Sequence, residues 1–165
     1  MIGDSARVSV SVSVAPALAF AAFTEDIDRW WRRGPKFRHS ASGSGFIRIE
    51  PRLHGRLFES IDSGGSTHVI EVGRIRVWDP PHRLAFSWRN SNFAAGENTD
   101  VEVRFEQSSS GTLVTVCHSG LASLRADHPA RHGNQGAAFS RMMGLWWGEQ
   151  MSSLRQFCSE PAPGA

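Results

Sequence analysis

The sequence predicts an α+β fold in which an antiparallel sheet packs against one long C-terminal helix. The first observation is a series of six strand-like runs between residues 46 and 120, separated by segments rich in glycine, proline, serine and asparagine. The second is that no helical period interrupts these runs, which is typical of an antiparallel meander. The third is a long segment, 135–157, whose apolar residues recur at helical spacing.

The length of 165 residues is enough for one well-buried core and too short for two ordinary domains. Hydrophobic residues make up 40% of the chain and charged residues 21%, close to the averages of soluble globular proteins. We therefore expect a single domain over residues 1–158, followed by a flexible tail at 159–165.

Charge and cysteine content exclude several classes of partner. The formal net charge is +2, Lys36 is the only lysine, and the arginines are spread along the chain, which argues against nucleic-acid binding. The sequence has no charged-then-apolar leader and no apolar run of eighteen residues, so we expect no membrane span. With only Cys117 and Cys158, we expect a reduced, cytoplasmic protein. The excess of arginine over lysine and the alanine-rich and glycine-rich segments suggest a bacterial source.

The N-terminal part predicts one strand and two short helices. Valine and serine alternate over residues 7–14, which indicates a half-buried strand. Pro16 is suited to the first turn of a helix, because its missing N–H has no partner there. Thr24 is a candidate N-cap for a further helical turn that carries Trp30 and Trp31.

The middle of the chain predicts the sheet. After a turn-rich loop at 40–45, the strand-like runs are 46–53, 55–61, 67–78, 83–89, 99–108 and 111–120. In two of these runs the apolar residues alternate with polar ones such as Ser87, Arg89, Glu102 and Arg104, so we expect one face in the core and the other in water. The apolar set is Leu84, Phe86, Trp88, Val101, Val103 and Phe105.

The last segment predicts the long helix, with Asn134 as its N-cap. Its expected buried stripe is Phe139, Met143, Trp147, Met151 and Leu154. Gly144 and Gly148 lie one turn apart, although each glycine costs a helix about 1 kcal/mol relative to alanine. They either allow a close approach of another backbone or leave open volume over a cavity.

Several runs resemble a known family. The residues that carry the resemblance lie in 50–59, in 71–88 and in 99–120, with the most specific pattern formed by Gly73, Trp78, Asp79, Pro80, Pro81, Arg83 and Trp88. They are similar to the START-like, or SRPBCC, superfamily, and within it to the proteins related to the activator of the Hsp90 ATPase. The resemblance implies a helix-grip fold: a curved antiparallel sheet around the C-terminal helix, with two short helices after the first strand. It also implies an apolar cavity between the sheet and that helix.

Aromatic and apolar side chains are the expected lining of this cavity, and the alternative is that they are plain core. The expected ligand-binding residues are Trp30, Trp31, Phe58, Phe86, Trp88, Val103, Phe105, Val116, His118, Met143, Trp147 and Met151. In particular, we expect His118, Trp88 and Trp147 to border one cavity.

His118 is the candidate catalytic residue, because strand period places it on the same face as Val114 and Val116. It could orient the polar end of a ligand or act as a general base, and the alternative is a structural histidine. Its neighbour Cys117 points to the opposite face, so the two form no dyad.

Two further groups of polar residues are candidate sites. Glu50, Arg52, Arg56 and Glu59 either line one mouth of the cavity or form a solvated outer face of the sheet. His128 and His132 have the i, i+4 spacing of metal ligands, but Pro129 lies between them and no glutamate or cysteine is near, so we expect a surface loop. We expect no metal and no other cofactor.

Three functions follow from the resemblance. The first is the binding of a small hydrophobic or amphipathic molecule in the cavity, by a monomer or a homodimer. The second is a cyclase-type or hydrolase-type enzyme that uses the same cavity. The third, ranked last, is an interaction module that modulates a chaperone ATPase, since the chain leaves no room for an additional chaperone-binding domain.

Overall fold

The computed structural model describes residues 4–40, 45–89 and 93–160. The turn-rich segment 41–44 and the tail residues 161–165 therefore lie outside the described residues. In chain order the elements are β1 (Ala6–Val12), α1 (Pro16–Thr24), α2 (Ile27–Trp30), β2 (Phe46–Ile49), β3 (Arg56–Ser63), β4 (Ser66–Asp79), β5 (Arg83–Trp88), β6 (Thr99–Ser108), β7 (Gly111–Ser119), the 3-10 helices η1 (Leu121–Ser123) and η2 (Pro129–Arg131), and α3 (Gly136–Ser159).

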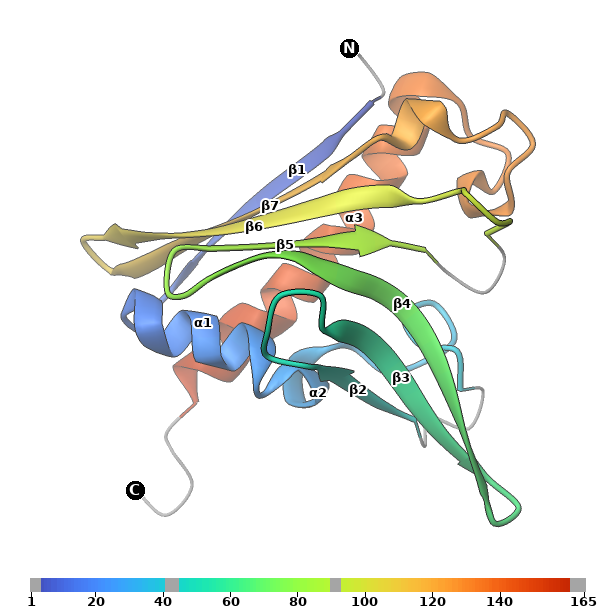
Figure 1. The fold of residues 1–165 in the computed structure, drawn as a ribbon. Coiled ribbons are helices and arrows are strands. Elements are labelled where there is room, and N and C mark those ends of the chain that lie inside the picture. The colour runs from blue at the N-terminus through green and yellow to red at the C-terminus, as the bar shows by residue number, and fades with distance from the viewer. Residues whose placement is uncertain (1–3, 41–44, 90–92, 161–165) are drawn as a thin grey trace.

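The strands form one seven-stranded sheet in the order β1-β7-β6-β5-β4-β3-β2. Every neighbouring pair is antiparallel, which confirms the predicted meander. The strands β2 to β7 follow one another in chain order, and β1 joins the far edge beside β7 (Figure 1). The first strand is thereby brought next to the last.

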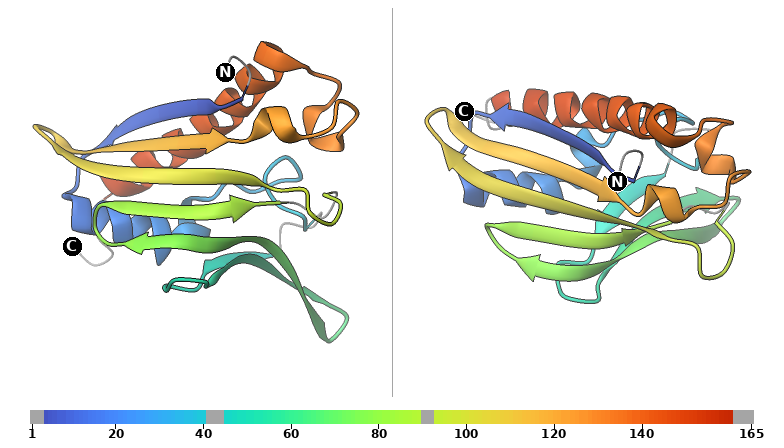
Figure 2. Two further views of the ribbon diagram at one scale, coloured as in Figure 1. Left: turned by 45° about the horizontal axis from the view of Figure 1, so that its top comes forward. Right: turned by 90° about the horizontal axis from the view of Figure 1, so that it is seen from above.

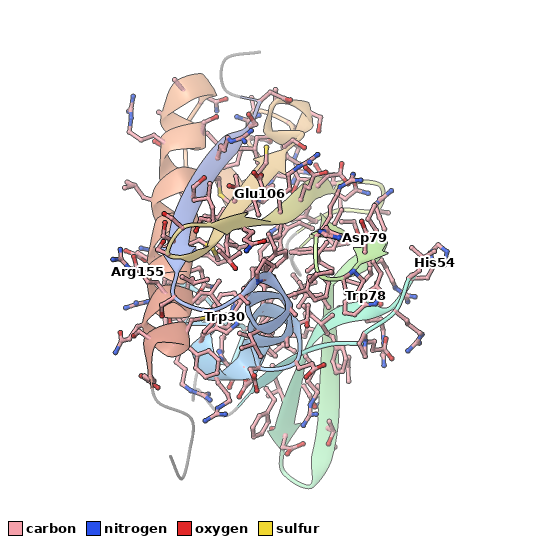
Figure 3. The ribbon with its side chains drawn as sticks, turned by 90° about the vertical axis from the view of Figure 1, so that its left-hand side faces the viewer. Trp30, His54, Trp78, Asp79, Glu106 and Arg155 are labelled. Carbon is pink, nitrogen blue, oxygen red and sulfur yellow. The ribbon has the colours of Figure 1, made fainter. Side chains whose placement is uncertain are left out.

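The sheet is curled, and the helices lie on its concave side (Figure 2). The long helix α3 runs along β1, while α1 and α2 pack between α3 and the rest of the sheet. In the view of Figure 3, Arg155 points outward from α3, and Trp30 lies inside the molecule near α1. This arrangement confirms the α+β helix-grip fold that the resemblance implies.

Strand alternation produces the predicted core face. Leu84, Phe86, Val101, Val103 and Phe105 are each at most 2% exposed. They cover the concave side of the sheet, as the period-2 pattern requires.

Ser87 departs from the predicted solvated face, because it is buried. Its hydroxyl accepts a hydrogen bond from the backbone N–H of Arg74 (3.0 Å), next to an irregularity in the β4–β5 pairing. Gly73 allows this close approach, since a Cβ there would lie 1.8 Å from the backbone oxygen of Ser87.

One end of the concave side is filled by α1. Phe20 packs its ring against Trp78 and Phe105, each with ring centroids 5.1 Å apart, and Phe23 lies 5.8 Å from Phe105. The predicted capping role of Thr24 is wrong, because its hydroxyl donates to the carbonyl of Phe20 inside α1 and Asp26 precedes α2.

The buried stripe of α3 is largely as predicted, with Met143 half-buried at its edge. Asn134 does not cap the helix: Gln135 holds that position, and the Asn134 amide donates to the carbonyl of Arg131. Gln150 is also buried, and its Oε1 accepts the backbone N–H of Arg32 at 2.9 Å. The fully buried residues of the stripe are Phe139, Trp147, Gln150, Met151 and Leu154.

Neither interpretation of the helix glycines is supported. A Cβ added at Gly144 or Gly148 would meet no heavy atom within 4 Å, so no backbone approaches them closely. Neither residue lines the cavity described below. Within the described part of the chain, no helix is both long enough and apolar enough to cross a membrane.

Candidate functional site

A cavity of about 780 Å³ lies between the sheet and the N-terminal half of α3. Its floor is formed by the side chains of β2 to β5 that point to the concave side: Ile47, Leu57, Val72 and Trp88. Its roof comes from α3 and consists of Phe139, Met142, Met143, Leu145 and Trp146. The segment 35–39 closes one side, and Phe93 together with Leu121, Leu124, Ala130 and His132 closes the other. Leu145 is 67% exposed, so the cavity opens to solvent beside α3.

Three indole rings form a continuous aromatic part of the wall. Trp31 stacks on Trp88 with ring centroids 6.0 Å apart, and Trp146 meets both edge-on at 5.7 and 5.6 Å. The indole N–H of Trp31 donates to the carbonyl of Phe37, and that of Trp146 donates to the carbonyl of Lys36. These two bonds hold the 35–39 segment against the aromatic wall.

His118 lies in the wall with both ring nitrogens hydrogen-bonded. The indole N–H of Trp147 can only donate, so Nδ1 of His118 accepts it at 3.1 Å and the ring proton sits on Nε2. Nε2 then donates to the hydroxyl of Thr99 at 2.6 Å, and that hydroxyl donates to the carbonyl of Trp88 at 3.4 Å. Burial lowers the pKa of His118 to about 3, so the imidazole is neutral at physiological pH.

These bonds favour the structural interpretation of His118 that the sequence left open. A general base needs a free nitrogen lone pair directed at the ligand, and here the lone pair of Nδ1 is already occupied by Trp147.

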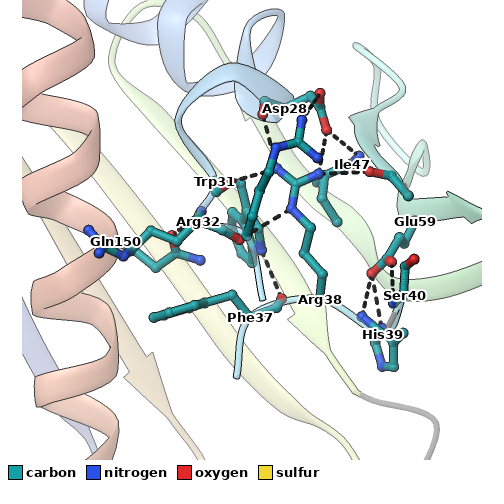
Figure 4. A network of polar contacts seen from close by, with 12 residues as sticks. Asp28, Trp31, Arg32, Phe37, Arg38, His39, Ser40, Ile47, Glu59 and Gln150 are labelled. Carbon is teal, nitrogen blue, oxygen red and sulfur yellow. Dashed lines mark hydrogen bonds and ion pairs between the residues drawn. The ribbon is translucent and has the colours of Figure 1, made fainter. Parts of the chain in front are cut away.

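Glu59 on β3 is a fully buried carboxylate that also lines the cavity. Oε1 accepts the backbone N–H of His39 at 2.8 Å and lies 3.3 Å from Nδ1 of the same residue, while Oε2 accepts the backbone N–H of Ser40 at 2.9 Å (Figure 4). Gly45 packs directly against this carboxylate, since a Cβ there would lie 2.5 Å from Oε2. The polar end of the cavity is thus built from two chain segments.

Arg38 is buried beside this end but is fully engaged elsewhere. Its five N–H groups donate to the carboxylate of Asp28 and to the backbone carbonyls of Asp28, Trp31, Arg32 and Gly45 (Figure 4). The hydrogen bonds of Arg38 therefore tie it to residues 28–32 and to Gly45, and they leave no guanidinium N–H for Glu59.

Of the twelve residues expected to bind a ligand, the structure places four in the cavity wall: Trp31, Trp88, His118 and Met143. The others lie outside the wall. Phe58 is half-buried on the opposite face of β3, where Arg56 stacks on its ring. Trp147 lies directly behind the wall, in contact with Trp88 and His118, so the predicted set of three is together but only two of its members face the cavity. The remaining side chains pack in the core: Trp30, Phe86, Val103, Phe105, Val116 and Met151.

The charged group predicted across two strands separates into two environments. Glu50, Arg52 and Arg56 lie outside the cavity, where Glu50 Oε1 and Arg56 Nε are 2.8 Å apart. The hydrogen bonds from Arg56 lower the pKa of Glu50 to about 2. Glu59 alone faces the interior, because it is on the same face of β3 as Leu57.

Of the two loop histidines, His132 is exposed, as predicted, and His128 is not. His128 is buried rather than on the surface, with its ring edge-on to Phe93 at 4.4 Å and Nε2 3.3 Å from Glu97. His132 lies in the cavity wall. Among residues 4–40, 45–89 and 93–160, no three histidine, cysteine, aspartate or glutamate side chains group in a way that could hold a metal ion.

Several wall residues were missed from the sequence, above all His39, Phe37, Phe93, Met142 and Trp146. Met142 and Trp146 have an i, i+4 spacing and form a second apolar stripe beside the one that was predicted, which was a usable signal. The residues of the 35–39 segment have no periodic pattern, so only the fold places them.

Comparison with known proteins gives one decisive match. The model of the family described as activator of Hsp90 ATPase homolog 1-like protein matches residues 13–155. The chain belongs to this family. A search of curated proteins finds no match.

Solved structures similar to this family member share its fold. An Hsp90 activator from Plasmodium falciparum has 20% identity and a TM-score of 0.63, with 96% of this chain and 99% of that chain covered. A protein of Chromobacterium violaceum has 13% identity and a TM-score of 0.64 over the same shares. A protein of Mesorhizobium loti has 15% identity and a TM-score of 0.61, with 92% and 94% covered. At these identities the likeness concerns the fold alone.

Proposed function

We propose that this protein binds a small apolar or amphipathic molecule in the cavity between the sheet and α3. The observation that carries the proposal is the cavity itself: about 780 Å³, walled mainly by apolar and aromatic side chains, with few polar groups. Well-packed cores contain few voids larger than a water molecule, so a space of this size fits the dimensions of a ligand pocket.

The aromatic wall supports a ring-containing or acyl ligand. Trp31, Trp88 and Trp146 offer ring faces and edges, and burial of apolar surface contributes about 25 cal/mol per Å² before the entropic cost of association. The indole N–H of Trp88 has no hydrogen-bond partner among the described residues, so it is available to an oxygen of an amphipathic ligand.

Ligand binding without turnover is the version of the proposal that we favour. The imidazole of His118 is neutral and both of its nitrogens are hydrogen-bonded, which does not support a role in proton transfer. The family name and one similar structure refer to Hsp90 activation, but the likeness to that structure is one of fold, so a chaperone partner stays a lower-ranked alternative. We also propose a cytoplasmic location, and the free thiols of Cys117 and Cys158 support this proposal.

The test is a titration with the neutral fluorophore N-phenyl-1-naphthylamine. We expect saturable binding at one site with micromolar affinity, accompanied by quenching of tryptophan emission, because three tryptophans form part of the wall. Val72→Phe should weaken binding at least tenfold, since the larger side chain projects from the cavity floor. Val69→Phe is the matched control on the same strand, because Val69 is 49% exposed, and it should bind like the wild type. Equal affinity in both variants would contradict the proposal.

A further inference from the structure

Glu59 and His39 form a carboxylate–imidazole pair in the wall of the cavity. Glu59 is fully buried, and the side chain of His39 is 21% exposed, so the imidazole is the more accessible partner. A buried carboxylate costs several kcal/mol unless hydrogen bonds compensate it. Here the backbone N–H groups of His39 and Ser40 provide two such bonds.

Among the described residues, the side chain of Glu59 has one side-chain partner, the ring of His39. Arg38, the neighbouring buried cation, donates all its N–H groups to Asp28 and to backbone carbonyls. Because both oxygens of Glu59 already accept backbone N–H groups, the carboxylate acts as an acceptor and the proton of the imidazole lies on Nδ1.

With its proton on Nδ1, a neutral His39 presents a lone pair at Nε2. Nε2 has no hydrogen-bond partner in residues 4–40, 45–89 and 93–160, and it is not among the fully buried polar atoms. Among the other polar side chains of the wall, His118 is occupied by Trp147 and Thr99, and Lys36 by Glu149 at 2.9 Å. The indole N–H of Trp88 can only donate, and His132 lies on the opposite side of the cavity from Glu59. His39 is thus the acceptor that the wall leaves open next to a buried negative charge.

We propose that Nε2 of His39 accepts a hydrogen bond from a hydroxyl group of the bound ligand, and that Glu59 is the positioning residue that fixes the tautomer. This inference rests on the proposed function of the cavity and names the ligand class: an apolar ring or chain that carries an alcohol or phenol donor. A ligand with a carboxylate at this position is disfavoured, because its charge would face the buried carboxylate of Glu59.

The experiment compares 2-naphthol with 2-methoxynaphthalene by isothermal titration calorimetry. The two probes share a ring system, and only 2-naphthol carries a donor. The acceptor nitrogen is uncharged, so the wild type should bind 2-naphthol roughly 2- to 12-fold more tightly than 2-methoxynaphthalene.

Three variants separate a role in ligand selection from a role in folding. His39→Phe keeps a ring and removes the acceptor, so the ratio of the two dissociation constants should fall close to one. Glu59→Gln should also reduce this ratio, because the amide no longer fixes the proton on Nδ1, whereas a merely structural loss would weaken both probes equally. Glu71→Gln removes a carboxylate from the neighbouring strand, where it pairs with Arg74 on the surface, and should keep the wild-type ratio.

The outcomes distinguish this inference from the proposed function. If 2-methoxynaphthalene binds the wild type as tightly as 2-naphthol, the role of His39 is wrong while the cavity proposal stands. If neither naphthalene nor the fluorophore binds, both proposals fail. The wild-type comparison decides the matter even if Glu59→Gln does not fold.

Discussion

At the scale of the residue, the two hydrogen bonds of His118 favour a structural role over the catalytic role that the sequence also allowed. Its imidazole joins α3 to two strands of the sheet, through Trp147 on one side and Thr99 on the other. Both bonds require the neutral ring with its proton on Nε2. Burial lowers the pKa of His118, because protonation would place a charge without solvation in the interior of the folded protein.

This burial predicts a pH dependence of stability. The folded pKa of His118 is about 3, below the ordinary value of 6.5, so the unfolded chain takes up a proton at a pH where the folded protein does not. The contribution to the free energy of unfolding is complete above the unfolded pKa and is lost as pH falls from about 6.5 towards 3, by roughly 1.4 kcal/mol per pH unit.

The measurement is urea unfolding of the wild type and of His118→Gln between pH 5 and 7. The wild type should take up about one more proton on unfolding at pH 5 than the variant does. His68→Gln, which changes an exposed histidine of the β3–β4 hairpin, should keep the wild-type slope. Equal slopes in wild type and His118→Gln would show that the ring is not held neutral.

At the scale of the element, the side of α3 that faces the protein carries two distinct stripes of apolar residues. One stripe, which includes Trp147 and Met151, is fully buried, and a second stripe with Met142 and Trp146 forms the cavity roof. The helix therefore contributes to the core and to the candidate site at once. Gly144 and Gly148 contribute neither to the core packing nor to the cavity wall, because a Cβ added at either position would meet no heavy atom within 4 Å.

Alanine at these two positions should consequently stabilise the protein. Each glycine in a helix interior costs about 1 kcal/mol relative to alanine, and neither substitution meets a steric obstacle. We expect Gly144→Ala and Gly148→Ala each to raise the free energy of unfolding by about 0.5 to 1 kcal/mol, measured by urea denaturation, without changing fluorophore affinity. A loss of stability would indicate a close contact on this face of α3.

For the whole molecule, the concave side of the sheet is divided into a filled end and an open end. The phenylalanines of α1 pack on Phe105 and Trp78 at the filled end. At the open end, Val72 and Leu57 line the cavity. Five of the six tryptophans are joined by ring contacts at or near this boundary: Trp30, Trp31, Trp88, Trp146 and Trp147.

Ligand binding should therefore stabilise the folded molecule as a unit. A ligand that binds only the folded state at 100 times its dissociation constant raises the free energy of unfolding by about 2.7 kcal/mol. We expect this increase for the wild type with N-phenyl-1-naphthylamine, measured by urea denaturation followed by far-UV circular dichroism. Val72→Phe at the same fluorophore concentration should gain far less, and a gain equal to the wild type would place the bound fluorophore elsewhere.

The sequence by itself determined the fold class, the antiparallel meander and most of the core. Periods of 2 and 3.6 residues depend on local backbone geometry, so Val103 and Leu154 could be assigned to the interior without knowledge of their neighbours. The same periods could not separate a core residue from a cavity residue, because both face inward. Phe105 and Trp88 share one face of the sheet, yet Phe105 is covered by α1 and Trp88 borders open space.

Only the tertiary structure decided the composition of the candidate site. His39 and Glu59 are twenty positions apart and belong to a non-periodic segment and a strand, so their contact follows from the path of the chain after α2. Glu59 and Arg56 looked alike in the sequence, but they lie on opposite faces of β3, and the curl of the sheet turns one of these faces inward. A polar group is free for a ligand only if no neighbouring residue already forms a hydrogen bond with it, and these neighbours are known only from the folded molecule.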